Sequence, residues 1–103
     1  MKLSVIERIT LMQILPKEAN YLTFKILINL KSALSFNEKE YKDFGMQEKD
    51  GQIHWKKSVN KEIEIGEKAK EIISSALMEL DKAGKLTEVS YLLYEKFVET
   101  SKT

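Results

Sequence analysis

The sequence predicts an α+β fold that is mostly helical, with about five helices and a small antiparallel β-hairpin inserted after the third helix. Apolar residues recur at helical spacing in several segments, and Asp50-Gly51 marks one tight hairpin turn. No linker or internal repeat divides the 103 residues. A chain of this length is near the common size for one hydrophobic core, so we expect residues 1–103 to form a single domain.

The first expected helix follows Ser4 and ends at about Leu15. Ser4 and Glu7 form a capping box, in which each side chain binds a backbone amide that the helix start leaves open. Pro16 ends the helix, because proline disfavours helical geometry in the residue before it. Most of the circumference is apolar, and only one narrow stripe is expected to face water: Glu7, Thr10 and Gln13.

The second expected helix runs from about Tyr21 to Leu34, with Asn20 as its N-cap. Its only polar stripe consists of Lys25, Asn29 and Ser32. A helix that is apolar nearly all round is buried on several sides, so we expect the first two helices to form the centre of the fold. Their surplus apolar surface lies either against the hairpin and the last helices, or in a homodimer or partner groove.

A short charged helix is expected next, from Phe36 to about Asp43. Ser35 and Glu38 stand at the spacing of a second capping box, which would open this helix. Charged residues dominate it, so Glu38 and Glu40 are expected to face solvent.

A β-hairpin follows, because Asp50-Gly51 suits a type I′ turn in which both central residues have positive φ. The expected pairs are Met46 with Trp55, Gln47 with His54, Glu48 with Ile53, and Lys49 with Gln52. The apolar face then holds Phe44, Met46, Ile53 and Trp55, and the wet face holds Gln47, Lys49, Gln52, His54 and Lys56. We expect the apolar face to pack over the helices, with Trp55 in the core against the first two.

Residues 61–65 alternate as a short strand, with Ile63 and Ile65 on one face. This strand could extend the hairpin into a three-stranded sheet, and the sequence leaves its pairing open.

Two helices complete the chain. An i, i+3, i+4, i+7 pattern predicts a helix after Gly66, and Gly84 suits the C′ position beyond its end. Thr87 is the expected N-cap of the last helix. Its inner face is expected to consist of Val89, Leu92, Leu93 and Phe97.

Composition and charge narrow the classes of function. The chain has no cysteine, so disulfides, thiolate chemistry and cysteine-based zinc sites are excluded. Its net charge of +1 lacks the strong bias of a nucleic-acid-binding arm or an acidic tail. We find neither a signal-peptide pattern nor an apolar run near the ~20 residues of a membrane span, so a cytoplasmic protein is expected.

No residue pattern points to catalysis. His54, the one histidine, is expected on the wet face of the hairpin, without the orienting partner and pocket that a general base needs. The carboxylates have neither catalytic nor EF-hand spacing, and the glycines form neither a P-loop nor a dinucleotide fingerprint. We therefore expect no enzyme activity, no metal site and no cofactor, and no small-molecule substrate is evident. A small-ligand binder is a third interpretation, which would need a pocket that the sequence does not display.

A winged-helix DNA-binding protein is the alternative interpretation. Residues 21–34 and 36–43 would form the helix pair, and the Asp50-Gly51 turn would be the tip of the wing. The recognition helix would carry more acidic than basic residues, whereas DNA phosphates call for cations. Lys49, Lys56 and Lys57 in the wing compensate little, so nucleic acid is not the expected partner.

The expected function is protein–protein association. A well-formed fold without catalytic or metal residues, together with surplus apolar helix surface, favours a protein partner or a second copy in a homodimer. The candidate partner surface consists of Lys49, Gln52, His54 and Lys56 on the hairpin, and of Tyr91 and Tyr94 near the edge of the apolar stripe of the last helix.

Three local features stand out: Ile14-Leu15-Pro16, the lone Trp55 after a charged turn, and the ending Gly84-Lys85-Leu86 followed by Leu93-Tyr94-Glu95-Lys96-Phe97. In these features the chain resembles small uncharacterised proteins encoded by bacteriophages and prophages. The resemblance implies an accessory factor, an inhibitor of a host or defence protein, or a small virion component, acting through protein contacts in a bacterial host. It carries no catalytic or binding residues with it.

Overall fold

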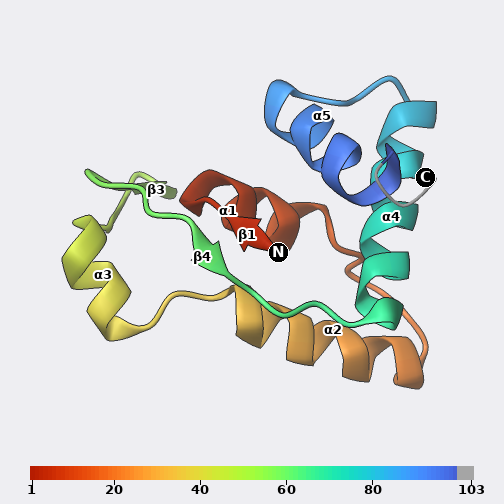
Figure 1. Ribbon diagram of the computed structural model, residues 1–103, viewed down its shortest axis with the longest axis horizontal. Helices are drawn as coiled ribbons and strands as arrows, with labels where there is room; N and C mark the ends of the chain where they lie inside the picture. The colour runs from red at the N-terminus through yellow and green to blue at the C-terminus, as the bar shows by residue number, and fades with distance from the viewer. Residues whose placement is uncertain (100–103) are drawn as a thin grey trace.

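The computed structural model describes residues 1–99 and has the expected order of elements, with one additional strand at its start (Figure 1). The elements are β1 (Lys2–Leu3), α1 (Val5–Ile14), α2 (Tyr21–Leu34), α3 (Glu38–Phe44), β2 (Gln47–Lys49), β3 (Gln52–His54), β4 (Lys61–Glu62), α4 (Glu67–Lys82), α5 (Glu88–Tyr94) and the π-helical turn η1 (Glu95–Glu99). In the view of Figure 1, α1 lies between α2 below and α5 above, with α4 at one end and α3 and the hairpin at the other. The predicted class, a mostly helical α+β fold with a small hairpin, is confirmed. Within residues 1–99, no helix combines the length and apolar character needed to cross a membrane.

The first two helices begin and end close to the predicted residues. The Ser4 hydroxyl accepts a hydrogen bond from the Glu7 amide, and the Glu7 carboxylate accepts one from the Ser4 amide, so the first capping box is confirmed. The Asn20 side chain accepts from the amide of Thr23 and caps α2 as predicted. Local capping chemistry therefore determines where these two helices begin.

The start of α3 differs from the prediction by two residues. Its capping box consists of Asn37 and Glu40, and the predicted box of Ser35 and Glu38 is wrong. Ser35 instead closes the last turn of α2, because its backbone N–H donates to the Lys31 carbonyl. The Ser35 hydroxyl also bonds back to α2, where it donates to the Ser32 carbonyl over 2.8 Å.

The hairpin has the predicted turn and register. Asp50 and Gly51 have φ values of 54° and 75°, the left-handed conformation that a type I′ turn requires. The pairs Gln47↔His54, Glu48↔Ile53 and Lys49↔Gln52 are confirmed. Its apolar face packs on α1 in a cluster that joins Val5, Ile9, Phe44 and Met46 with the half-buried Phe36, Ile53 and Trp55. This cluster includes residues of α1 but none of α2, so Trp55 packs with one of the two helices expected.

Residues 61–62 pair with the start of the chain, not with the hairpin. β4 is antiparallel to β1, with Lys2 opposite Glu62 and Leu3 opposite Lys61. The described sheets therefore each have two strands. The prediction that Ile63 and Ile65 point to one side is confirmed, since both side chains are buried in the main core.

The main core lies between α1, α2, α4 and the end of the chain. Its buried members are Leu3, Leu11, Leu15, Leu27, Leu30, Leu34, Ile63, Ile65, Ala69, Ile73, Leu77, Leu93, Phe97 and Val98. α2 contributes one face only, through Leu27, Leu30 and Leu34. The expectation that α2 is buried on several sides is wrong, because it runs along one edge of the molecule with no described element beneath it in Figure 1.

The last helix turns a different face inward from the one predicted. Thr87 caps it as expected, but its capping-box partner is Ser90, whose side chain is buried. With Ser90 and Leu93 inside, Leu92 points outward and is 53% exposed, so its assignment to the inner face is wrong. Val89 is half-buried and Phe97 is buried, as predicted. The wider spacing of the π-helical turn also buries Val98 beside Phe97.

Candidate interaction surface

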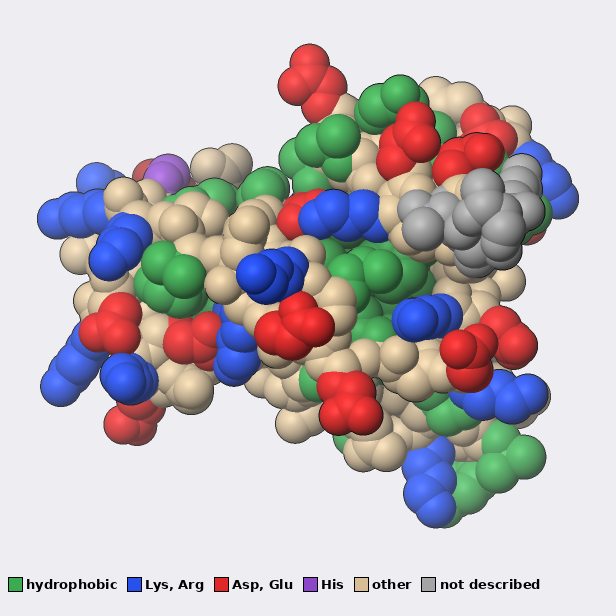
Figure 2. All heavy atoms as spheres, viewed as in Figure 1, with side chains coloured by type: hydrophobic (Ala, Val, Ile, Leu, Met, Phe, Trp, Pro, Cys, Tyr) green, Lys and Arg blue, Asp and Glu red, His purple; other side chains and the backbone are tan. Residues whose placement is uncertain are grey.

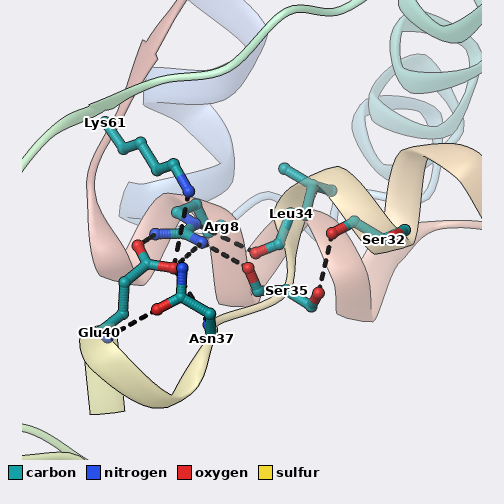
Figure 3. Close-up of polar contacts among 7 residues, drawn as sticks. All are labelled: Arg8, Ser32, Leu34, Ser35, Asn37, Glu40 and Lys61. Carbon is teal, nitrogen blue, oxygen red and sulfur yellow. Dashed lines mark hydrogen bonds and ion pairs between the residues drawn. The ribbon is translucent and has the colours of Figure 1, made fainter. Parts of the chain in front are cut away.

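Arg8, in the middle of α1, is fully buried and caps the end of α2 (Figure 3). Its Nε atom donates to the Leu34 carbonyl over 3.1 Å, and its Nη2 atom donates to the Ser35 carbonyl over 2.6 Å. Carbonyls at the end of a helix have no partner within that helix, and a cation is favourable there because of the helix dipole. Arg8 therefore fixes the carboxyl end of α2 against α1.

Glu40 of α3 binds the same guanidinium group. Its two carboxylate oxygens lie 2.7 Å from Nη1 and 3.3 Å from Nη2 of Arg8, which is a bidentate ion pair. The hydrogen bond from Arg8 lowers the pKa of Glu40 below its ordinary value. The Phe36 ring lies 3.9 Å from the guanidinium carbon, and the Lys61 ammonium lies 3.6 Å from the Glu40 carboxylate. The expectation that Glu40 faces solvent is therefore wrong.

Glu7 is a second buried charge on α1, which contradicts its expected place on a wet stripe. Its carboxylate accepts from the Ser4 amide over 2.9 Å and lies 2.7 Å from the ammonium of Lys96. Burial alone would raise the pKa of Glu7, but the hydrogen bonds and charge of Lys96 and the Ser4 amide outweigh it, and the pKa lies below the ordinary value. Lys96 also donates to the Lys2 carbonyl, so this pair links η1 to the start of α1.

Both networks are structural. Arg8 is inaccessible to any ligand, and Glu7 keeps only 7% of its surface exposed. Within the described part of the chain, every buried polar side-chain atom has a hydrogen-bond partner. The two networks fix α2, α3 and η1 around α1.

α2 presents a strongly apolar outer face. Tyr21 is 78% exposed and Ile28 is 59% exposed, and one helical turn separates each of them from Phe24 and Lys25. Together with Ala19 they line a shallow hollow of about 430 Å³. We call the five lining residues the α2 surface: Ala19, Tyr21, Phe24, Lys25 and Ile28. Leu22, which is 72% exposed, extends the apolar area to the adjacent side of the helix.

α5 presents a second apolar face. Tyr91 and Leu92 are both about half exposed and lie on the same face as Glu88. A hollow of about 480 Å³ lies on this face. We call the residues that line it the α5 surface: Leu86, Thr87, Glu88, Tyr91 and Leu92. The Glu95 carboxylate accepts a hydrogen bond from the Tyr91 phenol and raises the pKa of Tyr91 above its ordinary value. Figure 2 shows hydrophobic side chains over α5 at the top and at the beginning of α2 at the lower right.

The structure places the six predicted partner residues in two separate regions. Lys49, Gln52, His54 and Lys56 are exposed on the hairpin, and Tyr91 is exposed on α5. Tyr94 is half-buried and packs against the main core. Figure 1 shows the hairpin beside α3, and α5 above α1 and beside the upper end of α4, so the two sets do not form one surface.

The α2 surface was missed at the sequence level because an all-round apolar helix was interpreted as a buried one. The polar stripe predicted on this helix, Lys25, Asn29 and Ser32, does face solvent. On a helical wheel, Tyr21 and Ile28 stand next to Lys25. They must be exposed with it unless another layer covers them, so this adjacency was the signal available in the sequence.

In residues 1–99, no group of three or more His, Cys, Asp and Glu side chains is placed to hold a metal ion. The hollows of the α2 and α5 surfaces are lined mainly by apolar side chains, each with one charged side chain at its side. This arrangement can bury apolar area against another molecule and place one charge pair beside it.

No family model, no curated protein and no solved structure matches the chain.

Proposed function

We propose that this chain is a non-enzymatic protein–protein interaction module whose main contact is the α2 surface. The observation that supports the proposal is the exposure of Tyr21 and Ile28 on a helix whose other side is fixed in the core. A few aromatic and large aliphatic side chains near the centre of an interface usually contribute most of its binding energy. Burial of one such side chain contributes about 1.5–3 kcal/mol.

The fold does not need these side chains. α2 is held from inside by Leu27, Leu30 and Leu34, and its carboxyl end is held by Arg8. Polar residues at positions 21 and 28 would maintain the helix equally well and would be better solvated. Contiguous apolar residues on one exposed face mark interaction sites, whereas single exposed apolar residues are ordinary on protein surfaces.

The narrower role that we propose is that of an accessory protein of a phage or mobile element, or an inhibitor of a host or defence protein. The resemblance of the sequence to phage- and prophage-encoded proteins supports this role. In this role the protein would occupy a surface of its target, for which a stable scaffold with an exposed apolar patch is suited.

A binding experiment with matched variants tests the proposal. The wild-type chain, a Tyr21→Gln/Ile28→Gln variant and a Val59→Gln/Met78→Gln control are immobilised and exposed to bacterial lysate. Val59 and Met78 are each 42% exposed and line neither hollow, so the control replaces two exposed apolar side chains elsewhere on the molecule. Proteins retained by the wild type are identified by mass spectrometry, purified and titrated by calorimetry.

We expect a purified partner that binds the wild type and the control alike and binds the α2 variant at least tenfold more weakly, a loss of about 1.4 kcal/mol or more. A wild type that retains nothing beyond the α2 variant, and that stays monomeric up to ~1 mM, would contradict the proposal. A gel shift on random duplex DNA at low salt is run in parallel. Salt-sensitive binding there would favour the winged-helix alternative instead.

A further inference from the structure

The α2 and α5 surfaces lie on opposite sides of the molecule. In Figure 1, α2 forms the lower edge and α5 the upper edge, with α1 between them. The helical residues of the α2 surface, Tyr21, Phe24, Lys25 and Ile28, follow the i, i+3, i+4, i+7 spacing of one helix face. In the α5 surface, Glu88, Tyr91 and Leu92 follow the same spacing, and Glu95, the first residue of η1, continues it beyond that surface. Each is therefore a single helix face that a second helix can contact along its length.

The two surfaces differ in charge. The α2 surface contains one charged residue, the exposed Lys25, and α2 has no acidic residue. The segment 86–95 contains two acidic residues, Glu88 and Glu95, and no lysine or arginine. Figure 2 shows the same contrast, with acidic side chains beside the hydrophobic group over α5 and basic ones beside the beginning of α2.

We propose that the α2 surface of one copy binds the α5 surface of a second copy. In this contact the apolar side chains of Tyr21 and Ile28 pack against Tyr91 and Leu92, and Lys25 faces the carboxylates that flank the α5 surface. Complementary charges around an apolar centre favour this pairing over like-charged alternatives. The proposal rests on the proposed function and names the chain itself as one partner.

A symmetric contact between two α2 surfaces is less favourable. In an antiparallel pair of identical helices, the two-fold axis passes near the midpoint of the contact stripe. The stripe from Tyr21 to Ile28 has its midpoint beside Lys25. The axis would therefore bring two lysine ammonium groups together in a partly desolvated site, which disfavours the symmetric pair.

A contact between two different surfaces leaves one of each unoccupied in a dimer. Further copies can then add at either end, so the assembly grows with concentration unless it closes into a ring. One helix face against another is smaller than the ~800 Å² per partner of a standard interface, so we expect a dissociation constant between about 10 µM and about 1 mM.

Sedimentation velocity of two variants and their mixture tests the pairing. The α2 variant is Tyr21→Gln/Ile28→Gln, and the α5 variant is Tyr91→Gln/Leu92→Gln; glutamine suits helical positions, and all four side chains are at least half exposed. Circular dichroism and thermal unfolding check that each variant remains folded. The Val59→Gln/Met78→Gln variant is the control for lost apolar area.

We expect the average mass of the wild type and the control to rise with concentration, and each variant alone to associate at least tenfold more weakly. A 1:1 mixture of the two variants should regain association and stop at a dimer, because each copy supplies the surface that the other lacks. Lys25→Glu should weaken association and Glu88→Lys should restore it when mixed with Lys25→Glu.

Three results would overturn the proposal: a wild type that stays monomeric up to ~1 mM, an α5 variant that associates like the wild type, or a variant mixture that stays monomeric. The second result would indicate an α2–α2 pair. Retention of another protein through the α2 surface, together with a monomeric wild type, would refute self-assembly and leave the proposed function standing.

Discussion

Replacement of Glu40 by glutamine should destabilise the protein strongly, because it breaks the ion pair of Arg8. The substitution removes the charge that faces a fully buried guanidinium group while keeping the shape of the side chain. Removing one partner of a buried ion pair costs about 3–5 kcal/mol. The Glu40 side chain is 12% exposed, and the glutamine oxygen can still accept one hydrogen bond, so we expect the low end of this range, about 3 kcal/mol.

A double-mutant cycle with Arg8→Met isolates the pair. Arg8→Met leaves the Leu34 and Ser35 carbonyls without their donor, and we expect it to cost about 3 kcal/mol or more. In the double variant Arg8→Met/Glu40→Gln, neither charge is left unpaired. Its cost should therefore be smaller than the sum of the single costs by about 2 kcal/mol.

Urea unfolding at pH 7 measures these differences. Trp55 fluorescence follows the cluster beneath the hairpin, and circular dichroism follows the helices. Glu48→Gln, an exposed carboxylate on the hairpin, is the matched control and should change the free energy of unfolding by less than about 0.5 kcal/mol. A Glu40→Gln cost below about 1 kcal/mol, or single costs that simply add, would refute the reasoning.

Three further predictions follow from the same structure. The pKa values of Glu7 and Glu40 are lowered on folding, so the stability that these carboxylates contribute is complete above their pKa in the unfolded chain and is lost as the pH falls through the lower pKa of the folded state. Urea unfolding between about pH 6 and about pH 3 should show this loss. A variant with Gln at both positions should show a flatter dependence of stability on pH. Gly51→Ala should lower the free energy of unfolding by about 1 kcal/mol. The φ of Gly51 is +75° and an added Cβ would have no other atom within 4 Å, so backbone strain is the whole effect. Thermal unfolding measures this cost, and an unchanged stability would contradict the turn geometry. Ile28→Ala should change the free energy of unfolding by less than about 0.5 kcal/mol, whereas the neighbouring Leu27→Ala should cost about 2–5 kcal/mol; equal costs would place Ile28 in the core.

Local signals in the sequence predicted most of the elements. The Ser4 box, the Asn20 and Thr87 caps and the Asp50-Gly51 turn each depend on a few neighbouring residues, and the structure confirms all four. Such features need no knowledge of the rest of the chain. For the same reason the hairpin register could be derived from its turn alone.

The errors concern relations between distant segments. Arg8 and Glu40 are 32 positions apart, and neither residue type is expected in the interior unless its partner is known. Residues 2–3 are too few to show strand alternation, so the pairing of β1 with β4 could not be derived. Leu92 was placed inside because the sequence does not show that Ser90 turns inward.

The candidate site was only partly within reach of the sequence. Tyr91 was identified from its place at the edge of an apolar stripe, and it is half exposed. The apolar surplus of α2 was recognised, and the structure locates it at Tyr21, Leu22 and Ile28. Whether an apolar face is covered depends on how many layers pack around the helix, and that is a property of the whole fold.

The central claim is that the protein acts through exposed helix faces. An amide NMR dilution series of the wild-type chain tests this claim most directly, and the series is repeated with any partner that the binding experiment identifies. We predict concentration-dependent shifts confined to residues 19–28 and 86–92, with the first set also shifting when a partner is added. Spectra that superimpose at all concentrations and with the partner, or shifts confined to the hairpin, would contradict the claim.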